Sequence, residues 1–575
     1  MTMTDFHPGL ILLIGALLAA VLPKRIRQGV MILAPFLAVL SVFGLQPGVS
    51  WNYAFLNGLE LELLKVDSLS WIFALIFSLV SLIGNIYALH IKKRGESAAG
   101  LAYAGSALGV VFAGDWLTLI FFWELMTVSS VFLIWYGKTP QALKAGLRYI
   151  LVHFFGGNLL LAGIFLKVSA GQTAVTALTG TGDAAFWLIL LGVSVNAAIP
   201  PLSAWLSDAY PEGTISGSVF LSAFTTKVAV YCLIRLFPGA ELLIWLGVIM
   251  TLYGVIFAII ENDIRRLLSY HIISQVGYMV AAAGIGTDMA LNGGVAHAYS
   301  HILYKSLLFM SAGAVIYATG RRKLTELGGL FRAMPAVVIL YMIAAFSISG
   351  MPLFNGFISK SMIVSAAAEG NLPIAELLLY LAGVGTFLSV GLKLPYFMFF
   401  GPDKGIKVQK IPFNMLIAMS FGAFLCILYG LMPSLLYRYL PYITVYNPFD
   451  LDHVVSTLQL LIAALAAFWI FIPKLGGHPV ISLDTDWFYR KPLVAFVMFF
   501  AGAATLIQRK SGLVGIRLLS GAIPIFANPH HLWFSKERNE PLWPVYSEDM
   551  YHFPVGAAVL MILLMFIVVF ACVWV

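Results

Sequence analysis

The sequence has few charged residues for its length. Asp, Glu, Lys and Arg make up 10% of its 575 residues, and hydrophobic residues make up 61%. Soluble domains carry roughly 25% charged residues, and a soluble chain of this length would predict several domains. The shortage of charge argues against that interpretation, and the composition predicts one all-α polytopic bundle in a lipid bilayer.

Cysteine is also scarce, and the common catalytic motifs are absent. Cys232, Cys426 and Cys572 are scattered and have neither disulfide nor metal-ligand spacing. The chain has no Walker-type loop, CxxC pair or HExxH motif. We therefore expect no cofactor, no metal and no redox site in this chain. Enzyme status stays open, at most as a subunit of a translocase or oxidoreductase complex.

The chain carries an excess of basic residues, with a formal net charge of +8. In a membrane protein this is first a topology signal, so we expect no nucleic-acid partner. Residues 1–9 hold no Lys or Arg and do not resemble a cleaved signal peptide. With the N-terminus outside, the basic clusters near residues 24–27, 92–94, 138–148, 265–266, 321–332 and 404–410 belong to inside loops. Strict alternation of the predicted spans does not place them all inside, so we expect one or two span boundaries to be wrong.

Apolar runs of about 20 residues predict membrane helices. Such runs occur near 8–22, 29–45, 69–90, 98–114, 116–136, 147–168, 184–206, 214–236, 242–260, 268–287, 292–318, 334–368, 376–400, 411–436, 454–474 and 554–575, with a weaker one near 493–508. The loop 46–68 is expected to form a small outside cap. The stretch 509–540 is expected to be an interfacial or lateral segment.

Two of these runs contain helix-breaking residues. Pro200 and Pro201 interrupt one, and Gly350, Pro352 and Gly356 interrupt the other. Interrupted membrane helices are tolerated only where protein or water satisfies the backbone, so they indicate an ion or substrate site.

Three ionisable residues share one face of the run 292–318. His297, His301 and Lys305 follow each other at intervals of four, which places them on one helix face in a ladder roughly 12 Å long. Charges near a bilayer centre are costly and normally face a protein interior or water. The ladder indicates a proton relay; a set of structural hydrogen bonds between helices is the alternative. Histidines on one face of one helix cannot clamp a haem iron from opposite sides.

Further ionisable residues fall inside other apolar runs: Glu124, His153, Lys227, Lys360 and Lys393. A row of such groups can pass charge changes across a bilayer. Each residue also has a structural interpretation. Glu124 could make a structural hydrogen bond, His153 could be a core histidine, and Lys393 could extend to the interface.

Several motifs resemble one family of membrane proteins. They are Val66-Asp67-Ser-Leu-Ser, Asp115-Trp-Leu-Thr-Leu, Phe122-Trp-Glu124-Leu-Met, Pro201 to Ala209, Ser222 to Tyr231, Asn262 to Tyr270, Gln275-Val-Gly-Tyr, the His297/His301/Lys305 ladder and Gly350 to Lys360. The chain is similar over roughly 60–435 to the antiporter-like subunits of respiratory complex I, membrane-bound hydrogenases and Mrp-type Na⁺/H⁺ antiporters. Within that family it looks most like the D-type subunits of Mrp antiporters.

The resemblance implies a fold and a set of site residues. The fold is a 14-helix core with two inverted five-helix repeats and two broken helices, here with extra C-terminal helices. The implied proton path runs through Glu124, Lys227, the group His297, His301 and Lys305, and an exit-side lysine, Lys360 or Lys393.

One position departs from the family pattern. Where the family has a lysine before the first break, paired with the glutamate, this chain has Asn196. An amide neither gains nor loses a proton. Either the first half-channel is rewired around Glu124, or the subunit serves as a scaffold.

We expect five regions: 1–97 with the N-terminal helices and outside loop, 98–237 and 238–400 as the two repeats, 401–475 as closing helices, and 476–575 as a C-terminal extension. The extension contains Leu483 to Lys491, which is similar to a segment of longer family members. In those members extra helices contact neighbouring subunits, and we expect the same use here.

The predicted function is ion translocation within a multisubunit complex of the cytoplasmic membrane. The transported ion is H⁺, exchanged for Na⁺ or driven by a redox partner. The alternatives are a structural subunit of the same complex and a stand-alone transporter of a small solute. The sequence does not identify the coupled ion, the transport direction or the partner subunits.

Overall fold

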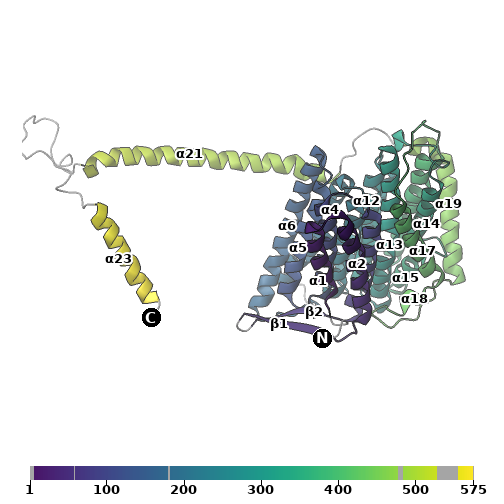
Figure 1. Ribbon diagram of the computed structural model, residues 1–575, viewed down its shortest axis with the longest axis horizontal. Helices are drawn as coiled ribbons and strands as arrows, with labels where there is room; N and C mark the ends of the chain where they lie inside the picture. The colour runs from purple at the N-terminus through teal and green to yellow at the C-terminus, as the bar shows by residue number, and fades with distance from the viewer. Residues whose placement is uncertain (1–5, 57–58, 179–181, 477–483, 528–554, 574–575) are drawn as a thin grey trace, which may run out of the picture. The chain divides into compact units, whose positions relative to one another are not determined.

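Long apolar helices make up most of the chain in the computed structural model (Figure 1). The structure describes residues 6–56, 59–178, 182–476, 484–527 and 555–573. The chain divides into two units, Met1–Asp486 and Trp487–Val575. Eleven of the described helices are long and apolar enough to cross a membrane. The prediction of an all-α polytopic fold is therefore confirmed, whereas the number of fourteen core helices stays a prediction.

The first half of the larger unit contains α1 (Pro8–Val21), α2 (Lys24–Gly44), α3 (Ser68–Ala88), α4 (Arg94–Phe112), α5 (Trp116–Trp135), α6 (Pro140–Ser169), α7 (Ala184–Asn196), α8 (Ala204–Ala209), η2 (Tyr210–Glu212), α9 (Gly217–Ala223) and α10 (Thr225–Leu236). Aspartates begin several helices of the bundle. Asp67 accepts a hydrogen bond from the Ser70 amide, and Asp115 accepts from the Leu117 and Thr118 amides. These side chains satisfy amides that the first helical turn leaves without partners.

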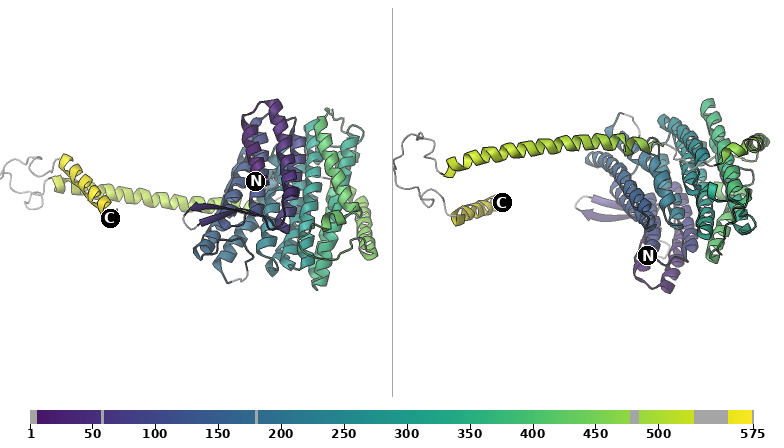
Figure 2. Two further views of the ribbon diagram at one scale, coloured as in Figure 1. Left: turned by 60° about the horizontal axis from the view of Figure 1, so that its bottom comes forward. Right: turned by 90° about the horizontal axis from the view of Figure 1, so that it is seen from above.

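The second half contains α11 (Glu241–Ile260), α12 (Ile264–Ile285), α13 (Asp288–Thr319), η3 (Leu324–Glu326), α14 (Pro335–Ser349), α15 (Asn355–Glu369), α16 (Pro373–Thr386), the π-helical η4 (Phe387–Lys393) and η5 (Tyr396–Phe400), α17 (Phe413–Leu431), α18 (Ser434–Tyr437) and α19 (Leu451–Leu475). Helix α13 is buried along nearly its whole length and packs against α12, α14, α15 and α17. In Figure 2 the purple and blue helices of the first half lie to one side of the bundle, and the teal and green helices of the second half lie to the other.

The loop predicted as a small cap contains a two-stranded antiparallel hairpin. Strand β1 (Ser50–Leu56) pairs with β2 (Leu59–Lys65), with Ser50 opposite Lys65 and Leu56 opposite Leu59. The Gly114 amide donates to the Glu62 carbonyl, and the Asp115 carboxylate accepts from the Glu62 amide at 2.8 Å. These bonds tie the hairpin to the start of α5. We call this end of the bundle the hairpin end.

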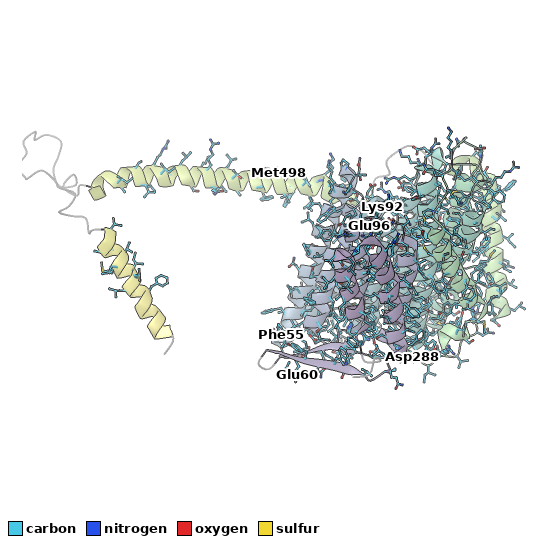
Figure 3. All side chains as sticks on the ribbon, in the orientation of Figure 1. Phe55, Glu60, Lys92, Glu96, Asp288 and Met498 are labelled. Carbon is cyan, nitrogen blue, oxygen red and sulfur yellow. The ribbon has the colours of Figure 1, made fainter. Side chains whose placement is uncertain are left out.

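The basic loops gather at the opposite end, which we call the basic end. Figure 3 places Glu60 and Asp288 at the hairpin end and Lys92 and Glu96 towards the other. When each interrupted helix counts as one crossing, alternation from α1 to α19 places every basic cluster of residues 24–27, 92–94, 138–148, 265–266, 321–332 and 404–410 at the basic end. We expected that strict alternation of the predicted spans would not place all basic clusters on the inside. That expectation was wrong, because the positive-inside pattern holds without moving a span.

Both predicted helix breaks are present. Helix α7 ends at Asn196 and α8 begins at Ala204, while α14 ends at Ser349 and α15 begins at Asn355. Each break holds one non-glycine residue with positive φ, Ala198 at 59° and Leu353 at 74°. That conformation is costly for residues with a Cβ and persists only where the surrounding structure imposes it.

A third interruption was not predicted. The span 214–236 divides at Phe224 into α9 and α10, because Phe224 has φ −101° and ψ −69°. The deviation leaves carbonyl oxygens of α9 without their usual helical partners.

The smaller unit contains most of α20 (Asp486–Arg490), followed by α21 (Pro492–Ala527) and α23 (Val555–Val573). The sequence predicted a separate span near 493–508 and then a lateral segment to 540. The structure instead has one continuous helix through 527, and residues 528–540 of that prediction lie outside the described residues. At about 1.5 Å per residue this helix is roughly 54 Å long, well beyond a hydrocarbon core of about 30 Å. The helix is thus longer than a single straight crossing needs, and its interfacial or lateral role stays a prediction.

Candidate functional site

The ladder on α13 lies in the interior of the bundle. His297, His301 and Lys305 are each 0% exposed. The His297 Nδ1 atom is 2.9 Å from Ser359 Oγ on α15, and its Nε2 atom is 3.5 Å from the Tyr304 hydroxyl. His297 therefore links α13 to the helix that follows the second break.

His301 and Lys305 have a different environment. The His301 ring centroid is 5.2 Å from that of Tyr304 and 6.3 Å from that of His297. Neither ring nitrogen of His301 and no hydrogen of the Lys305 ammonium group bonds to a protein atom among the described residues. Buried polar groups of this kind are the places in a protein interior where water binds.

Lys227 lies on α10, three residues after the interruption at Phe224 that separates α10 from α9. Its Nζ atom donates to the Ser222 carbonyl at 2.6 Å and to Thr226 Oγ1 at 3.2 Å, and the side chain is 0% exposed. The Ser222 carbonyl is available because the helix deviates at Phe224. The interruption thus supplies the acceptor that holds a buried ammonium group.

Lys360 uses the second break in the same way. Its Nζ atom donates to the Ile348 carbonyl at 2.6 Å and lies 5.1 Å from the centroid of the Tyr278 ring. A Cβ on Gly356 would lie 1.7 Å from the Ser347 carbonyl oxygen, so only glycine permits this approach of α15 to the end of α14. The break both frees a carbonyl and brings the lysine to it.

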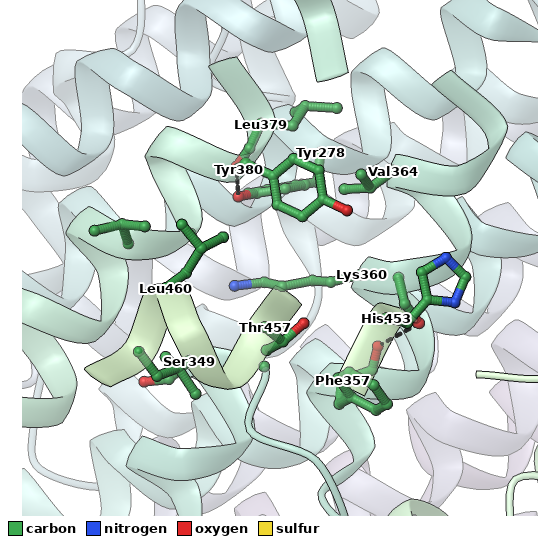
Figure 4. Close-up of a pocket in the computed structure, with 15 residues that line it drawn as sticks. Tyr278, Ser349, Phe357, Lys360, Val364, Leu379, Tyr380, His453, Thr457 and Leu460 are labelled. Carbon is green, nitrogen blue, oxygen red and sulfur yellow. Dashed lines mark hydrogen bonds between the residues drawn. The ribbon is translucent and has the colours of Figure 1, made fainter. Parts of the chain in front are cut away.

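A cavity of about 60 Å³ adjoins Lys360. A water molecule needs roughly 10–15 Å³ of such space, so the cavity has room for several. Figure 4 shows Lys360 extended across the cavity, with Tyr278 and Tyr380 on one side and Thr457 on the other. His453 also lines it and lies near the start of α19, at the hairpin end. The cavity therefore extends from Lys360 in the hairpin-end direction.

The central lysines lie close enough together for their charges to interact. Lys227 and Lys360 both act electrostatically on Lys305. His301 is within reach of the same three lysines, and His271 on α12 is within reach of Lys305, Lys360 and Lys393. The structure thus brings Lys227, the α13 ladder and Lys360 into one electrostatically connected group.

Lys393 occupies the opposite side of the second half. Its ammonium group donates to the carbonyls of Ile259 and Glu261 at the end of α11, at the basic end. It is 1% exposed, so it does not extend into solvent. The sequence left Lys360 and Lys393 as alternatives for an exit-side lysine, and their positions separate them: Lys360 faces the hairpin-end cavity and Lys393 the basic end.

Glu124, the acidic residue predicted for the proton path in the first half, has no cationic partner among the described residues. Glu124 on α5 points at α6, where a Cβ on Gly157 would lie 1.9 Å from Glu124 Oε1. No salt bridge to Glu124 occurs among the described residues, and its Oε2 atom has no hydrogen-bond partner there. Asn196 is 0% exposed, and neither its Nδ2 nor its Oδ1 atom bonds to a described residue. The structure does not bring Glu124 together with the central lysines.

His153 belongs to an aromatic stack. Its ring lies 4.0 Å from that of Tyr149 and 4.4 Å from that of Trp205 on α8, centroid to centroid. The Tyr149 hydroxyl is 3.4 Å from Thr225 Oγ1, which in turn is 2.6 Å from the Tyr103 hydroxyl. A chain of hydroxyl groups thus runs from Tyr149, on which His153 stacks, to Thr225, the first residue of α10 and two residues before Lys227.

The neutral hydroxyl groups that lie between the ionisable residues were not predicted from the sequence. They are Tyr103, Tyr149, Thr225, Tyr304, Ser359 and Ser389. Ser and Tyr occur throughout membrane helices, so no pattern in one sequence separates these six. His271 was also missed, although it is an ionisable residue within an apolar run; its Nε2 atom is 2.6 Å from Ser389 Oγ.

The chain is similar to known membrane proteins. A family described as NADH:quinone oxidoreductase/Mrp antiporter, TM, matches residues 113–389. An uncharacterized protein of Methanocaldococcus jannaschii is 32% identical over 56% of this chain and 71% of its own length. The D-type member of the Na⁺/H⁺ antiporter of Alkalihalophilus pseudofirmus is 31% identical over 50% of this chain, and the match spans 62% of that relative.

A solved structure supports the same fold. The Mrp complex from Dietzia sp. DQ12-45-1b contains a chain that superposes with a TM-score of 0.78 at 24% identity, covering 95% of this chain and 65% of that one. The matched residues 113–389 include the two breaks, the α13 ladder and Lys360. With the Methanocaldococcus protein matched over 71% of its length, this chain belongs to the membrane-subunit family of NADH:quinone oxidoreductases and Mrp antiporters.

Proposed function

We propose that this antiporter-like membrane subunit translocates protons as part of a multisubunit complex in the cytoplasmic membrane. The path uses Lys227, His301, Lys305 and Lys360, with His297 beside them. Other membrane subunits are its partners, and Na⁺ is the proposed counter-ion, as in the name of the Alkalihalophilus relative. The chain itself contributes protonatable side chains and no cofactor.

The observation that carries the proposal is that three lysines and two histidines are buried inside the bundle on helices that pack against one another, α10, α13 and α15. Lys227 and Lys360 are held by carbonyl oxygens and not by carboxylates, so each can lose its proton without leaving a buried anion unpaired. A proton arriving on one lysine raises the cost of a proton on the next. Charge repulsion of this kind favours transfer along the row.

The cavity beside Lys360 supplies an exit. It is lined by Thr457 and His453, and the His453 Nε2 atom is 3.0 Å from Ser365 Oγ. Protons released by Lys360 would pass through water in the cavity towards the hairpin end. This end lacks the basic clusters, so it is the outer side by the positive-inside rule.

A structural subunit is the second candidate function. It is favoured by Asn196, which cannot carry a proton, and by Glu124, which has no cationic partner among the described residues. In that case the buried lysines are remnants of a path whose first half is disconnected.

Transport by the reconstituted complex tests the proposal. The complex would be purified with its partners, incorporated into proteoliposomes and assayed with a pH-sensitive dye under an imposed Na⁺ gradient. We expect Lys305→Met and His301→Gln each to reduce proton flux by about tenfold or more, because each removes a proton carrier. Lys407→Met, in an exposed loop of the basic end, is the matched control.

The outcomes separate the two candidates. Normal flux in both variants, with intact assembly, would show that the row does not carry protons. No flux from the wild-type complex under Na⁺, K⁺ or redox drive would favour the structural subunit.

A further inference from the structure

The chain that leads out of the larger unit carries a buried carboxylate. Asp484 lies beyond α19 and three residues before the smaller unit begins, yet it is only 5% exposed. Burying an ionised carboxylate is costly unless hydrogen bonds replace its water. The proposed proton path does not use this group.

Three hydroxyl groups from distant parts of the sequence surround Asp484. The Tyr270 hydroxyl on α12 donates to Oδ2 at 2.6 Å, and the Ser207 hydroxyl on α8 lies 3.3 Å from the same atom. The Tyr253 hydroxyl on α11 donates to Oδ1. Hydrogen bonds to a charged acceptor are roughly twice as strong as neutral ones. One carboxylate thus joins three helices.

Helix α8 depends on such contacts for its position. It has only six residues, and isolated helices of that length are unstable. Asp208 forms a bidentate ion pair with Arg148 on α6, at 2.7 and 2.9 Å. The neighbouring Ser207 contacts Asp484. Adjacent residues of α8 are therefore attached to α6 on one side and to Asp484 on the other.

The position of α8 sets the aromatic stack of the first half. Trp205 donates its indole N–H to the Val195 carbonyl at 2.9 Å and lies edge-on to His153. A shift of α8 would move Trp205 away from His153 and alter the chain of hydroxyl groups that leads from Tyr149 to Thr225. The second break has its own attachment through Lys360 and the Ile348 carbonyl.

We propose that Asp484 is a positioning residue for the first interrupted helix. Its carboxylate holds α8, and with it the Trp205–His153 stack, against α11 and α12. The proposal rests on the proposed function for its effect on transport, but its structural part can be tested alone.

Hydrogen exchange measured by mass spectrometry on the full-length chain in its complex tests the attachment. We expect Asp484→Ala to accelerate amide exchange in 197–213 roughly tenfold, since it leaves three hydroxyls without their shared acceptor. Exchange in 350–369, around the second break, should stay unchanged. Asp452→Ala, in the exposed first turn of α19, is the matched control.

Milder variants protect the test against misfolding. Tyr270→Phe and Ser207→Ala each remove one donor and keep the packing, so smaller accelerations confined to 197–213 are expected. The Asp484→Ala and Ser207→Ala effects should combine less than additively, because the two variants disrupt the same contact. Unchanged exchange in 197–213, or equal acceleration at both breaks, would overturn the proposal.

Transport then separates the two proposals. If Asp484→Ala loosens 197–213 and also lowers proton flux several-fold while Asp484→Glu restores it, the attachment serves transport. If Lys305→Met leaves flux normal, the proposed function fails, whereas the exchange result still decides the role of Asp484. If exchange is unchanged and Lys305→Met blocks flux, only the role of Asp484 is wrong.

Discussion

The two helix breaks predicted from proline and glycine share a backbone plan and differ in chemistry. Each break contains one non-glycine residue with positive φ, Ala198 in the first and Leu353 in the second. The second break presents Lys360 to a freed carbonyl and to a cavity. At the first break, the preceding helix ends at Asn196, and the buried amide of its side chain bonds to no described residue. Similar backbone geometry therefore does not guarantee an equivalent ion site.

The difference lies in what the break has available to hold a charge. At the second break, the approach of Gly356 to Ser347 brings the Lys360 side chain beside the open end of α14. At the first break, helix α8 places Trp205 against Tyr149 and His153 of α6. We propose that protons pass Lys227, the α13 ladder and the second break, whereas the first break is set by packing and by the attachment of α8 to Asp484.

The largest effect is expected at Lys360. Replacing it by Met removes the lysine that faces the cavity, and we expect proton flux in proteoliposomes to fall about 100-fold or more, within the range for loss of a proton-transfer group. Lys393→Met, at the basic end, should have a smaller effect. Equal loss in both variants would contradict the assignment of the exit to Lys360.

Stability should also distinguish the second break from the surroundings of Glu124. A Cβ on Gly356 meets a backbone oxygen at 1.7 Å, whereas one on Gly157 meets the flexible end of Glu124. We expect Gly356→Ala to destabilise the bundle by roughly 1–3 kcal/mol, as for other overpacked sites, and Gly157→Ala by less. Thermal unfolding in detergent measures both. A larger loss for Gly157→Ala would show that Glu124 is fixed in place.

Filling the cavity should slow the exit. Thr457→Leu adds apolar volume where water is expected beside Lys360, so we expect flux to fall roughly three- to tenfold with the assembly intact. Leu458→Phe is the control, since Leu458 is the next residue of α19 and is 37% exposed. Unchanged flux in Thr457→Leu would mean that protons leave by another route.

The smallest effect is expected at Glu124. Because no described cation pairs with it, we expect Glu124→Gln to lower flux by less than about threefold, far below the loss of a proton carrier. Measurement beside Asn196→Lys sharpens the comparison. If the added lysine makes flux strongly sensitive to Glu124→Gln, the asparagine is what disconnects the first half. If Glu124→Gln alone abolishes flux, Glu124 belongs to the proton path and the contrast between the breaks is wrong.

Sequence patterns predicted the membrane fold and both breaks well. Proline and glycine remove or strain helical backbone wherever they occur, so Pro200, Pro201, Gly350 and Pro352 were visible without a structure. The interruption at Phe224 was not visible, because phenylalanine carries no backbone signal. Yet this interruption frees the carbonyl that holds Lys227.

The pairing of side chains was predictable only within one helix. The spacing of His297, His301 and Lys305 placed them on one face of α13, and the structure buries all three. Contacts between helices, such as His297 with Ser359 or His153 with Trp205, join residues 62 and 52 positions apart and leave no periodic trace. The roles proposed for the site residues and the five-region division of the chain stay predictions.

By itself the sequence determined that this chain is a membrane bundle, where two of its helices are interrupted and which face of α13 is ionisable. Hydropathy and backbone chemistry are local properties, so the order of the residues alone contains them. Only the tertiary structure decided that Lys360 faces a cavity, that Glu124 stands apart from the lysines and that Asp484 joins three helices. Those facts depend on distances between residues far apart in the chain, which packing alone sets.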